Sequence, residues 1–220
     1  MSAHDTNTAL VYIDTDPNEA PSVPKFKRPL DIVGAAVALS LFSPIMLIVA
    51  VVIALTSRGP IFFRQVRVGL NGDTFEMLKF RSMFTDAEAR RAEIEAQSER
   101  DGVCFKMRND PRITAVGRFI RRTSIDELPQ LINVLRGEMS MVGPRPALPE
   151  ETVAYPARAH SRLRAMPGIT GLWQVSGRAD VGFDQMIELD LSYIRDCSLC
   201  NDIKLLFATV LVVVTGKGAY

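Results

Sequence analysis

Residues 32–56 form the longest apolar run of the chain and contain no charged residue. A helix needs about 20 apolar residues to cross a bilayer. Helices of soluble proteins that reach this length normally keep a polar face. The run therefore predicts a membrane helix rather than the buried core helix of a soluble protein.

Ser43-Pro44 lies at the middle of this run. Proline removes a backbone donor and clashes with the preceding turn, so we expect the helix to break there. Each half would span about 18 Å, short of the roughly 30 Å hydrocarbon core. Basic residues, which favour the cytoplasmic side, flank both ends: Lys25, Lys27 and Arg28 before the run, and Arg58, Arg64 and Arg67 after it. The pattern favours a re-entrant hairpin, with an ordinary kinked spanning helix as the alternative.

Three charged residues stand at the entry to the run. Arg28 and Asp31 are one helical turn apart, a spacing that allows their charges to pair at the membrane interface. For Lys27 we expect interfacial anchoring, with the aliphatic stem on apolar surface and the charge in water.

After residue 57 the pattern changes to that of a polar, folded body. Residues 61–69 read as a short strand, Asn71-Gly72 is a strong turn signal, and residues 74–80 are expected to return as a second strand. Residues 86–100 are rich in Ala, Glu and Arg and predict an exposed helix. We therefore expect an α/β body that is mostly helical, with a small hairpin or sheet near residues 61–80.

Residues 118–136 predict a helical stretch interrupted near Ser124. Thr123 or Ser124 is expected to cap a new helix, and Ser124 with Glu127 fits a capping box. Gly137 is expected to end this helix. Its buried stripe is predicted to contain Leu128, Leu131, Ile132 and Leu135.

The last two predicted helices have different patterns. Residues 186–195 carry a stripe of Ile187, Leu191 and Ile194. Residues 204–214 end in a ten-residue apolar run that is too short to span a membrane. This run fits equally a position on the membrane surface or in the core.

Composition and charge exclude several classes of protein. The 220 residues are 47% apolar and 23% charged, as expected of a chain that buries a core. The 26 basic and 25 acidic residues argue against a general nucleic-acid binder. Three cysteines are too few for a disulfide scaffold, and Cys197 and Cys200 lack the further soft ligands of a zinc site. We expect these two to serve ordinary packing or an interface.

The chain divides into three predicted regions. Residues 1–24 contain four acidic residues, several prolines and no Lys or Arg, which indicates a mobile acidic tail rather than a signal peptide. Residues 25–57 form the predicted membrane hairpin. Residues 58–220 form the predicted body, whose C-terminal helices are expected to lie close to the membrane.

Candidate chemistry centres on the adjacent carboxylates Asp126 and Glu127. Taken alone, both fit acids at the start of a helix, where they favour its dipole. Their surroundings suggest more: the Gly-Pro-Arg-Pro loop at 143–146 aims one guanidinium, and the glycine-rich block 167–178 ends in another arginine. Further arginines lie just upstream, namely Arg112, Arg118, Arg121 and Arg122. Arginine forks suit phosphate, so carboxylates among them suggest a divalent cation and a polyphosphate.

Taken together, these motifs resemble the bacterial sugar transferases, the monotopic phosphoglycosyl transferases that begin glycan assembly on a polyprenyl phosphate. The resemblance covers about 190 residues and excludes the first 25 or so. Its motifs are Lys-Arg-Pro-Leu-Asp at 27–31, Ser43-Pro44, Gly-Pro-Ile-Phe-Phe at 59–63, Lys-Phe-Arg-Ser-Met at 79–83, Ser-Ile-Asp-Glu-Leu-Pro-Gln at 124–130, Gly-Pro-Arg-Pro at 143–146, and the block 167–178. So many ordered motifs are far more specific than one short match.

The resemblance implies a reaction and roles for residues. Family members transfer a sugar-1-phosphate from a UDP-sugar to undecaprenyl phosphate and release UMP, and their membrane segment is a re-entrant helix broken at Ser-Pro. Asp126 would be the nucleophile that forms a phosphosugar–aspartyl intermediate. Glu127 would complete the dyad, holding Mg²⁺ or accepting a proton. The phosphate-binding side chains would be Arg121, Arg145 and Arg178, with Lys79 and Arg81 near the same site.

The resemblance also implies a location and leaves the donor open. It places the protein at the bacterial inner membrane, with the active site on the cytoplasmic face in contact with membrane lipids, and it is compatible with a homodimer. Ser176 and the C-terminal sequence resemble members that use glucose or galactose, whereas Cys197 and Cys200 stand where such members often carry tryptophan. The alternatives are an N-acetylhexosamine or modified sugar, and a non-catalytic membrane scaffold of polysaccharide assembly.

Overall fold

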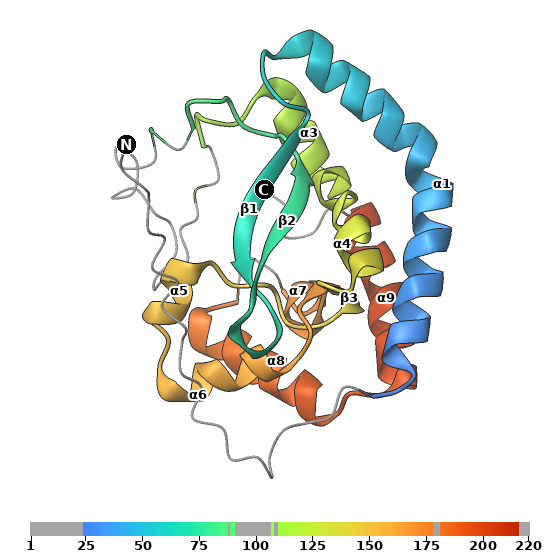
Figure 1. Ribbon diagram of the computed structural model, residues 1–220, viewed down its shortest axis with the longest axis vertical. Helices are drawn as coiled ribbons and strands as arrows, with labels where there is room; N and C mark the ends of the chain where they lie inside the picture. Colours follow the sequence, from blue (N-terminus) through green and yellow to red (C-terminus); the bar gives the residue numbers. More distant parts are fainter. Residues whose placement is uncertain (1–23, 88, 91–106, 108–109, 178–180, 216–220) are drawn as a thin grey trace, which may run out of the picture.

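The computed structural model describes residues 24–87, 89–90, 107, 110–177 and 181–215. Most of the predicted acidic tail and residues 91–100 of the predicted exposed helix lie outside this part of the chain. In it, one long helix flanks a mostly helical body with two small sheets (Figure 1). The predicted fold class is confirmed to that extent.

Helix α1 (Lys27–Thr56) contains the whole apolar run. Pro44 lies inside it, so the predicted interruption does not divide it into two helices, but Figure 1 shows that α1 bends between its first and second halves. In the described part of the chain, α1 is the one helix long and apolar enough to cross a membrane, and little of its most apolar stretch is buried against the body. Ala35 packs with Met77, Leu131 and Val134, which places α1 against β2 and α4.

The predicted hairpin is confirmed. Strand β1 (Phe62–Val68) pairs antiparallel with β2 (Thr74–Phe80), in a register that runs from Phe62 opposite Phe80 to Val68 opposite Thr74. The short 3₁₀ turn η1 (Leu70–Gly72) joins them. Asn71 and Gly72 both have positive φ, of 54° and 89°, which is the backbone that the Asn-Gly pair favours.

The interruption near Ser124 is confirmed, but the predicted capping box is wrong. The segments are α3 (Ala115–Arg122), the 3₁₀ turn η3 (Ile125–Glu127) and α4 (Gln130–Arg136). An N-cap residue normally has extended backbone. Ser124 instead has a left-handed φ of 55°, and its side chain makes no capping hydrogen bond.

Helix α4 ends at Gly137 as predicted, with φ of 86°. Its predicted stripe is only partly correct, because Leu131 is buried, Leu128 and Ile132 are half-buried and Leu135 is exposed. Val134, which was not predicted in the stripe, is fully buried. The polar side chain of Asn133 is fully buried in the same face. It accepts a hydrogen bond from the backbone N–H of Leu78 at 3.0 Å and donates to the carbonyl of Glu76 at 2.7 Å, which ties α4 to β2.

The C-terminal half of the body surrounds a second small sheet. Strand β3 (Ser140–Val142) pairs parallel with β4 (Gly168–Thr170). The helical segments of this half are α5 (Pro149–Val153), α6 (Ala157–His160), η4 (Ser161–Arg164), α7 (Leu172–Val175), α8 (Phe183–Arg195) and α9 (Leu199–Thr215). The predicted helix 186–195 is confirmed within α8, although Leu191 and Ile194 are only partly buried.

Helix α9 excludes one of the two alternatives for the C-terminal apolar run, namely a position wholly in the core. Leu205 packs into the body, but Phe207, Val210, Leu211 and Val214 are 60–80% exposed. Most of the run therefore lies on the protein surface rather than in the core.

The charged residues at the start of α1 have different partners from those predicted. Lys27 is buried, and its Nζ lies 2.7 Å from Oδ2 of Asp202 and 2.9 Å from the hydroxyl of Tyr193. It is not an interfacial anchor. Arg28 and Asp31 do not pair with one another in this structure either.

Arg28 and Asp31 instead bind the body separately. Arg28 donates to the carbonyls of Val134 and Leu135 at the end of α4. Asp31 accepts from the hydroxyl of Ser140 at 2.9 Å and from the backbone N–H of Met141 at 2.8 Å. These partners are more than 100 residues away in the chain, so the helical spacing used for the prediction carried no information about them.

Candidate active site

Turn η3 presents Asp126 and Glu127 side by side but in different environments. Asp126 is 7% exposed, whereas the side chain of Glu127 is about one-third exposed. Burial raises the pKa of the Asp126 carboxyl to about 6; the positive charge of Lys79 opposes this rise and the negative charge of Glu127 adds to it. Asp126 is thus a buried carboxylate whose charge is only partly compensated by its neighbours.

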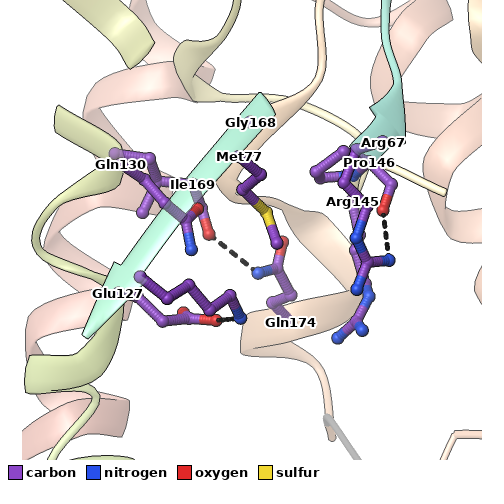
Figure 2. Close-up of a pocket in the computed structure, with 10 residues that line it drawn as sticks. Arg67, Met77, Glu127, Gln130, Arg145, Pro146, Gly168, Ile169 and Gln174 are labelled. Carbon is purple, nitrogen blue, oxygen red and sulfur yellow. Dashed lines mark hydrogen bonds and ion pairs between the residues drawn. The ribbon is translucent and has the colours of Figure 1, made fainter. Parts of the chain in front are cut away.

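Lys79 on β2 connects the hairpin to this turn. Its Nζ lies 2.8 Å from Oε1 of Glu127, the contact drawn at the lower left of Figure 2. Residues directly opposite each other in an antiparallel pair share a face. Lys79, Met77 and Arg67 therefore lie on one face of the hairpin, and that face is turned toward η3.

A pocket of about 260 Å³, which includes space open to solvent, lies next to this contact. Three of the residues predicted from the sequence line it: Lys79, Glu127 and Arg145. The remaining lining residues are Arg67, Met77, Gln130, Pro146, Gly168, Ile169 and Gln174 (Figure 2). The pocket thus brings together side chains from β2, η3 and the 143–146 loop, with cations facing an acidic turn.

The Gly-Pro-Arg-Pro loop follows β3 directly and comes very close to β4. A Cβ on Gly143 would lie 2.3 Å from the carbonyl oxygen of Met166 and 2.9 Å from the backbone nitrogen of Gly168, so only glycine fits. The N–H of Gly168 donates to the carbonyl of Pro144 at 2.8 Å. This packing fixes the backbone from which Arg145 extends.

Among the predicted site residues that the structure describes, Asp126, Arg121 and Arg81 do not line the pocket. Arg121, on the last turn of α3, is close enough for its charge to lower the pKa of Asp126. Arg81 directly follows β2, and its buried side chain reaches the C-terminal end of α1. There one guanidinium nitrogen donates to the carbonyl of Ser57 at 2.8 Å and to its hydroxyl at 2.7 Å. Arg178 lies outside the described residues.

Sequence reasoning missed Arg67, Gln130 and Gln174 as lining residues. From the sequence, Arg67 stands out only as a basic residue that follows the apolar run. The hairpin pattern contained the signal that could have found it, because the register set by the Asn-Gly turn places it on the face of Lys79. Gln130 and Gln174 lie within the motifs at 124–130 and 167–178, but no role follows for them from those motifs, and their place at the pocket results from the packing of α4 and α7.

Asp126 and Glu127 are the residues that could hold a Mg²⁺ ion shared with a substrate. Mg²⁺ is typically bound through one or two carboxylates together with substrate phosphates. No cluster of three or more potential ligands among His, Cys, Asp and Glu occurs in the described residues, so these residues offer no ready-made protein cage. The partly compensated burial of Asp126 is the feature that a nearby cation would relieve.

The sequence pattern that defines the bacterial sugar transferases matches residues 23–216, which include every element described above. The chain belongs to the bacterial sugar transferase family. The resemblance read from its motifs is thereby confirmed.

Three relatives show the range of this family. The galactosyl transferase CpsE of Streptococcus agalactiae is 47% identical over 194 residues, which are 88% of this chain and 43% of CpsE. The exopolysaccharide production protein ExoY of Rhizobium meliloti is 41% identical, over 88% of both chains. A UDP-glucose:undecaprenyl-phosphate glucose-1-phosphate transferase of Caulobacter vibrioides is 42% identical, over 88% of this chain and 72% of its own. The chain spans less than half the length of CpsE.

Proposed function

We propose that this sugar transferase moves galactose-1-phosphate or glucose-1-phosphate from a UDP-sugar to undecaprenyl phosphate and releases UMP, as the first membrane step of exopolysaccharide synthesis. The names of the relatives supply the substrate classes. The observation that carries the proposal for this chain is the buried carboxylate of Asp126, next to a Glu127–Lys79 contact at the edge of a cation-lined pocket.

The proposed reaction has two displacements at one phosphorus atom. An Asp126 oxygen attacks the phosphorus that bears the sugar, and the bond from that phosphorus to the bridging oxygen breaks, so that UMP leaves with the electron pair. A phosphate oxygen of the lipid then attacks the same phosphorus and releases the carboxylate. The product is the sugar joined to the lipid through a diphosphate. Carboxylates are established covalent nucleophiles, so this division into two steps is chemically sound.

The cationic side chains have a clear task in this scheme. A carboxylate that attacks a diphosphate meets like-charge repulsion, and preorganised cations reduce the repulsion and stabilise the departing UMP. We assign this task to Arg145 and Lys79, which line the pocket, and to Arg121, whose charge acts on Asp126. Asp126 and Glu127 would hold Mg²⁺, which when bound would supply further positive charge to the phosphates. The contacts of Arg81 with Ser57 suit a role in holding β2 against α1.

We further propose that α1 enters and leaves the cytoplasmic leaflet of the inner membrane as a re-entrant helix. Its exposed apolar surface, its central Pro44 and the exposed basic residues that flank it, Lys25 and Arg58, support this arrangement. The exposed apolar side chains of α9 would extend the same membrane contact. The pocket would then lie at headgroup level, where a soluble donor and a lipid acceptor meet.

Donor specificity and activity are tested by measuring UMP release. Purified protein in nanodiscs is mixed with Mg²⁺ and with UDP-glucose, UDP-galactose or UDP-N-acetylglucosamine, with and without undecaprenyl phosphate. We expect turnover that depends on the lipid and is greatest with one of the two plain hexoses. Preference for the N-acetylated donor would overturn the hexose assignment, and absence of release with all donors would favour a scaffold.

The topology of α1 is tested by cysteine labelling. Lys25→Cys and Arg58→Cys place one thiol just before and just after α1, in chains whose three native cysteines are replaced by serine. A membrane-impermeant maleimide is applied to intact spheroplasts and to inverted vesicles. We expect both positions to react only in inverted vesicles. Reaction of the two positions from opposite sides would show a spanning helix.

A further inference from the structure

The backbone around Arg145 is held through its carbonyl groups. Prolines on both sides of Arg145 have no N–H to donate, so hydrogen bonds can fix this stretch mainly through acceptors. Four successive carbonyls, those of residues 144–147, each accept a hydrogen bond: from the N–H of Gly168 at 2.8 Å, from Arg162 at 3.1 Å, from Arg67 at 3.0 Å and from the N–H of Val68 at 2.9 Å. Two of the four donors are therefore arginine side chains.

The side chain of Arg145 needs this support. It is exposed, and no hydrogen bond to another described residue fixes its guanidinium. Its direction into the pocket therefore depends on the orientation of its own backbone. The hydrogen bond from Nη2 of Arg162 to the carbonyl oxygen of Arg145 holds this backbone directly.

Arg162 is itself rigidly held in the interior. Its side chain is 2% exposed, and Nη2 also donates to Oδ2 of Asp190 at 2.6 Å. Nη1 donates to the hydroxyl of Tyr155 at 2.7 Å. Asp190, on α8, is 1% exposed. A buried ion pair is weak evidence for stability, because desolvation offsets most of the attraction. Its fixed geometry, however, suits the positioning of a third group.

We propose that Arg162, held by Asp190, is a positioning residue that sets the backbone of Arg145 and so aims the Arg145 guanidinium at the phosphates of the donor. This inference rests on the proposed function. It adds two residues from η4 and α8 that no motif in the sequence marked. It also explains why a buried charged pair lies directly behind the most exposed cation of the pocket.

The test compares Arg162→Lys and Asp190→Asn with a matched control, Arg158→Lys. Arg158 lies four residues before Arg162 and pairs with Asp184 and Glu188 of α8, the helix that also carries Asp190. All three of these side chains are solvent-exposed. Because small misplacements of positioned groups can lower rates by up to about 100-fold, we expect the first two variants to lower kcat by about 10- to 100-fold. Exposed pairs contribute little, so the control should stay within about 3-fold.

A double-mutant cycle separates positioning from general damage. If Arg162 acts through Arg145, adding Arg162→Lys to Arg145→Ala should change kcat by less than about 3-fold, because the group being aimed is already gone. The same large loss in both backgrounds would overturn the inference. So would unchanged turnover in both Arg162→Lys and Asp190→Asn. Asp190→Asn leaves Arg162 in place and keeps the test valid should Arg162→Lys fail to fold.

A second readout does not depend on turnover. The affinity of each variant for UMP is measured by calorimetry in the same nanodiscs. If Arg162 positions Arg145, Arg162→Lys should bind UMP more weakly than the unmodified protein, and the same substitution should have no further effect on binding in the Arg145→Ala background. Unchanged UMP binding in Arg162→Lys would contradict the inference. If the unmodified protein binds UMP but turns over no donor, the proposed function has failed, while this measurement still decides the inference.

Discussion

Replacing Lys27 with methionine removes the cation from a buried cluster that joins the start of α1 to α8 and α9. Methionine keeps much of the length and apolar character of the lysine stem, so the lost group is chiefly the ammonium. Asp202, which is fully buried, would keep the hydrogen bond from the hydroxyl of Tyr193 at 2.8 Å but would lose its counter-charge. The perturbation therefore leaves a nearly isolated buried carboxylate.

The size of the effect follows from that burial. Removing one partner of a buried ion pair destabilises a protein by about 3–5 kcal/mol. Both side chains here are 5% exposed or less, so exposure to solvent does not call for a discount. For a chain of this size 1 kcal/mol shifts the melting temperature by roughly 2–4 °C, so we expect Lys27→Met to lower it by about 6–20 °C.

The assay is thermal unfolding of all variants in the same detergent. Unfolding is detected as the loss of the monodisperse peak in size-exclusion chromatography. The control is Lys25→Met, which removes an exposed lysine two residues earlier. Lys27→Met combined with Asp202→Asn should recover a large part of the loss, because the unpaired carboxylate is gone. A melting temperature for Lys27→Met within about 2 °C of the control would refute the buried pair and restore the interfacial lysine predicted from the sequence.

Two further substitutions, each with a matched control, test the packing and the site. Gly117→Ala on α3 would place a Cβ 1.8 Å from the backbone oxygen of Ser82, so we expect it to destabilise the protein by about 1–3 kcal/mol in thermal unfolding. Gly182→Ala, which meets nothing within 4 Å, should unfold like the unmodified protein, and equal melting of the two variants would contradict the packing. Lys79→Met should lower kcat for UMP release by about 100-fold or more, because it removes a preorganised cation next to the dyad. Arg64→Met on the same hairpin removes an exposed partner of little weight, so comparable turnover in these two variants would exclude Lys79 from catalysis.

The sequence pattern correctly predicted those elements whose conformation depends on residues that are neighbours in the chain. The Asn-Gly turn fixed the hairpin, because both residues adopt the positive φ that such a turn needs. The long apolar helix α1 was predicted from the length of its run and its lack of charge alone. Gly137 ended α4 because glycine has no Cβ to oppose the left-handed backbone.

Contacts between distant segments escaped prediction for a physical reason. Lys27 at the start of α1 was interpreted from its neighbours in sequence, whereas its partner Asp202 is 175 residues away. The burial of Asn133 was not expected, because the backbone groups of β2 that stabilise it are distant in the sequence. The carboxylates and Arg145 were marked by motif, but the pair that supports Arg145 becomes visible only when η4 and α8 are placed behind the loop.

The most direct test of the proposed mechanism is intact-protein mass spectrometry of the lipid-free protein after incubation with Mg²⁺ and the preferred UDP-hexose. We predict an added mass of one phosphohexose, its discharge when undecaprenyl phosphate is supplied, and its absence in Asp126→Asn. Turnover by Asp126→Asn comparable to that of the unmodified protein would contradict the proposed mechanism, because the carboxylate of Asp126 could not then be the nucleophile.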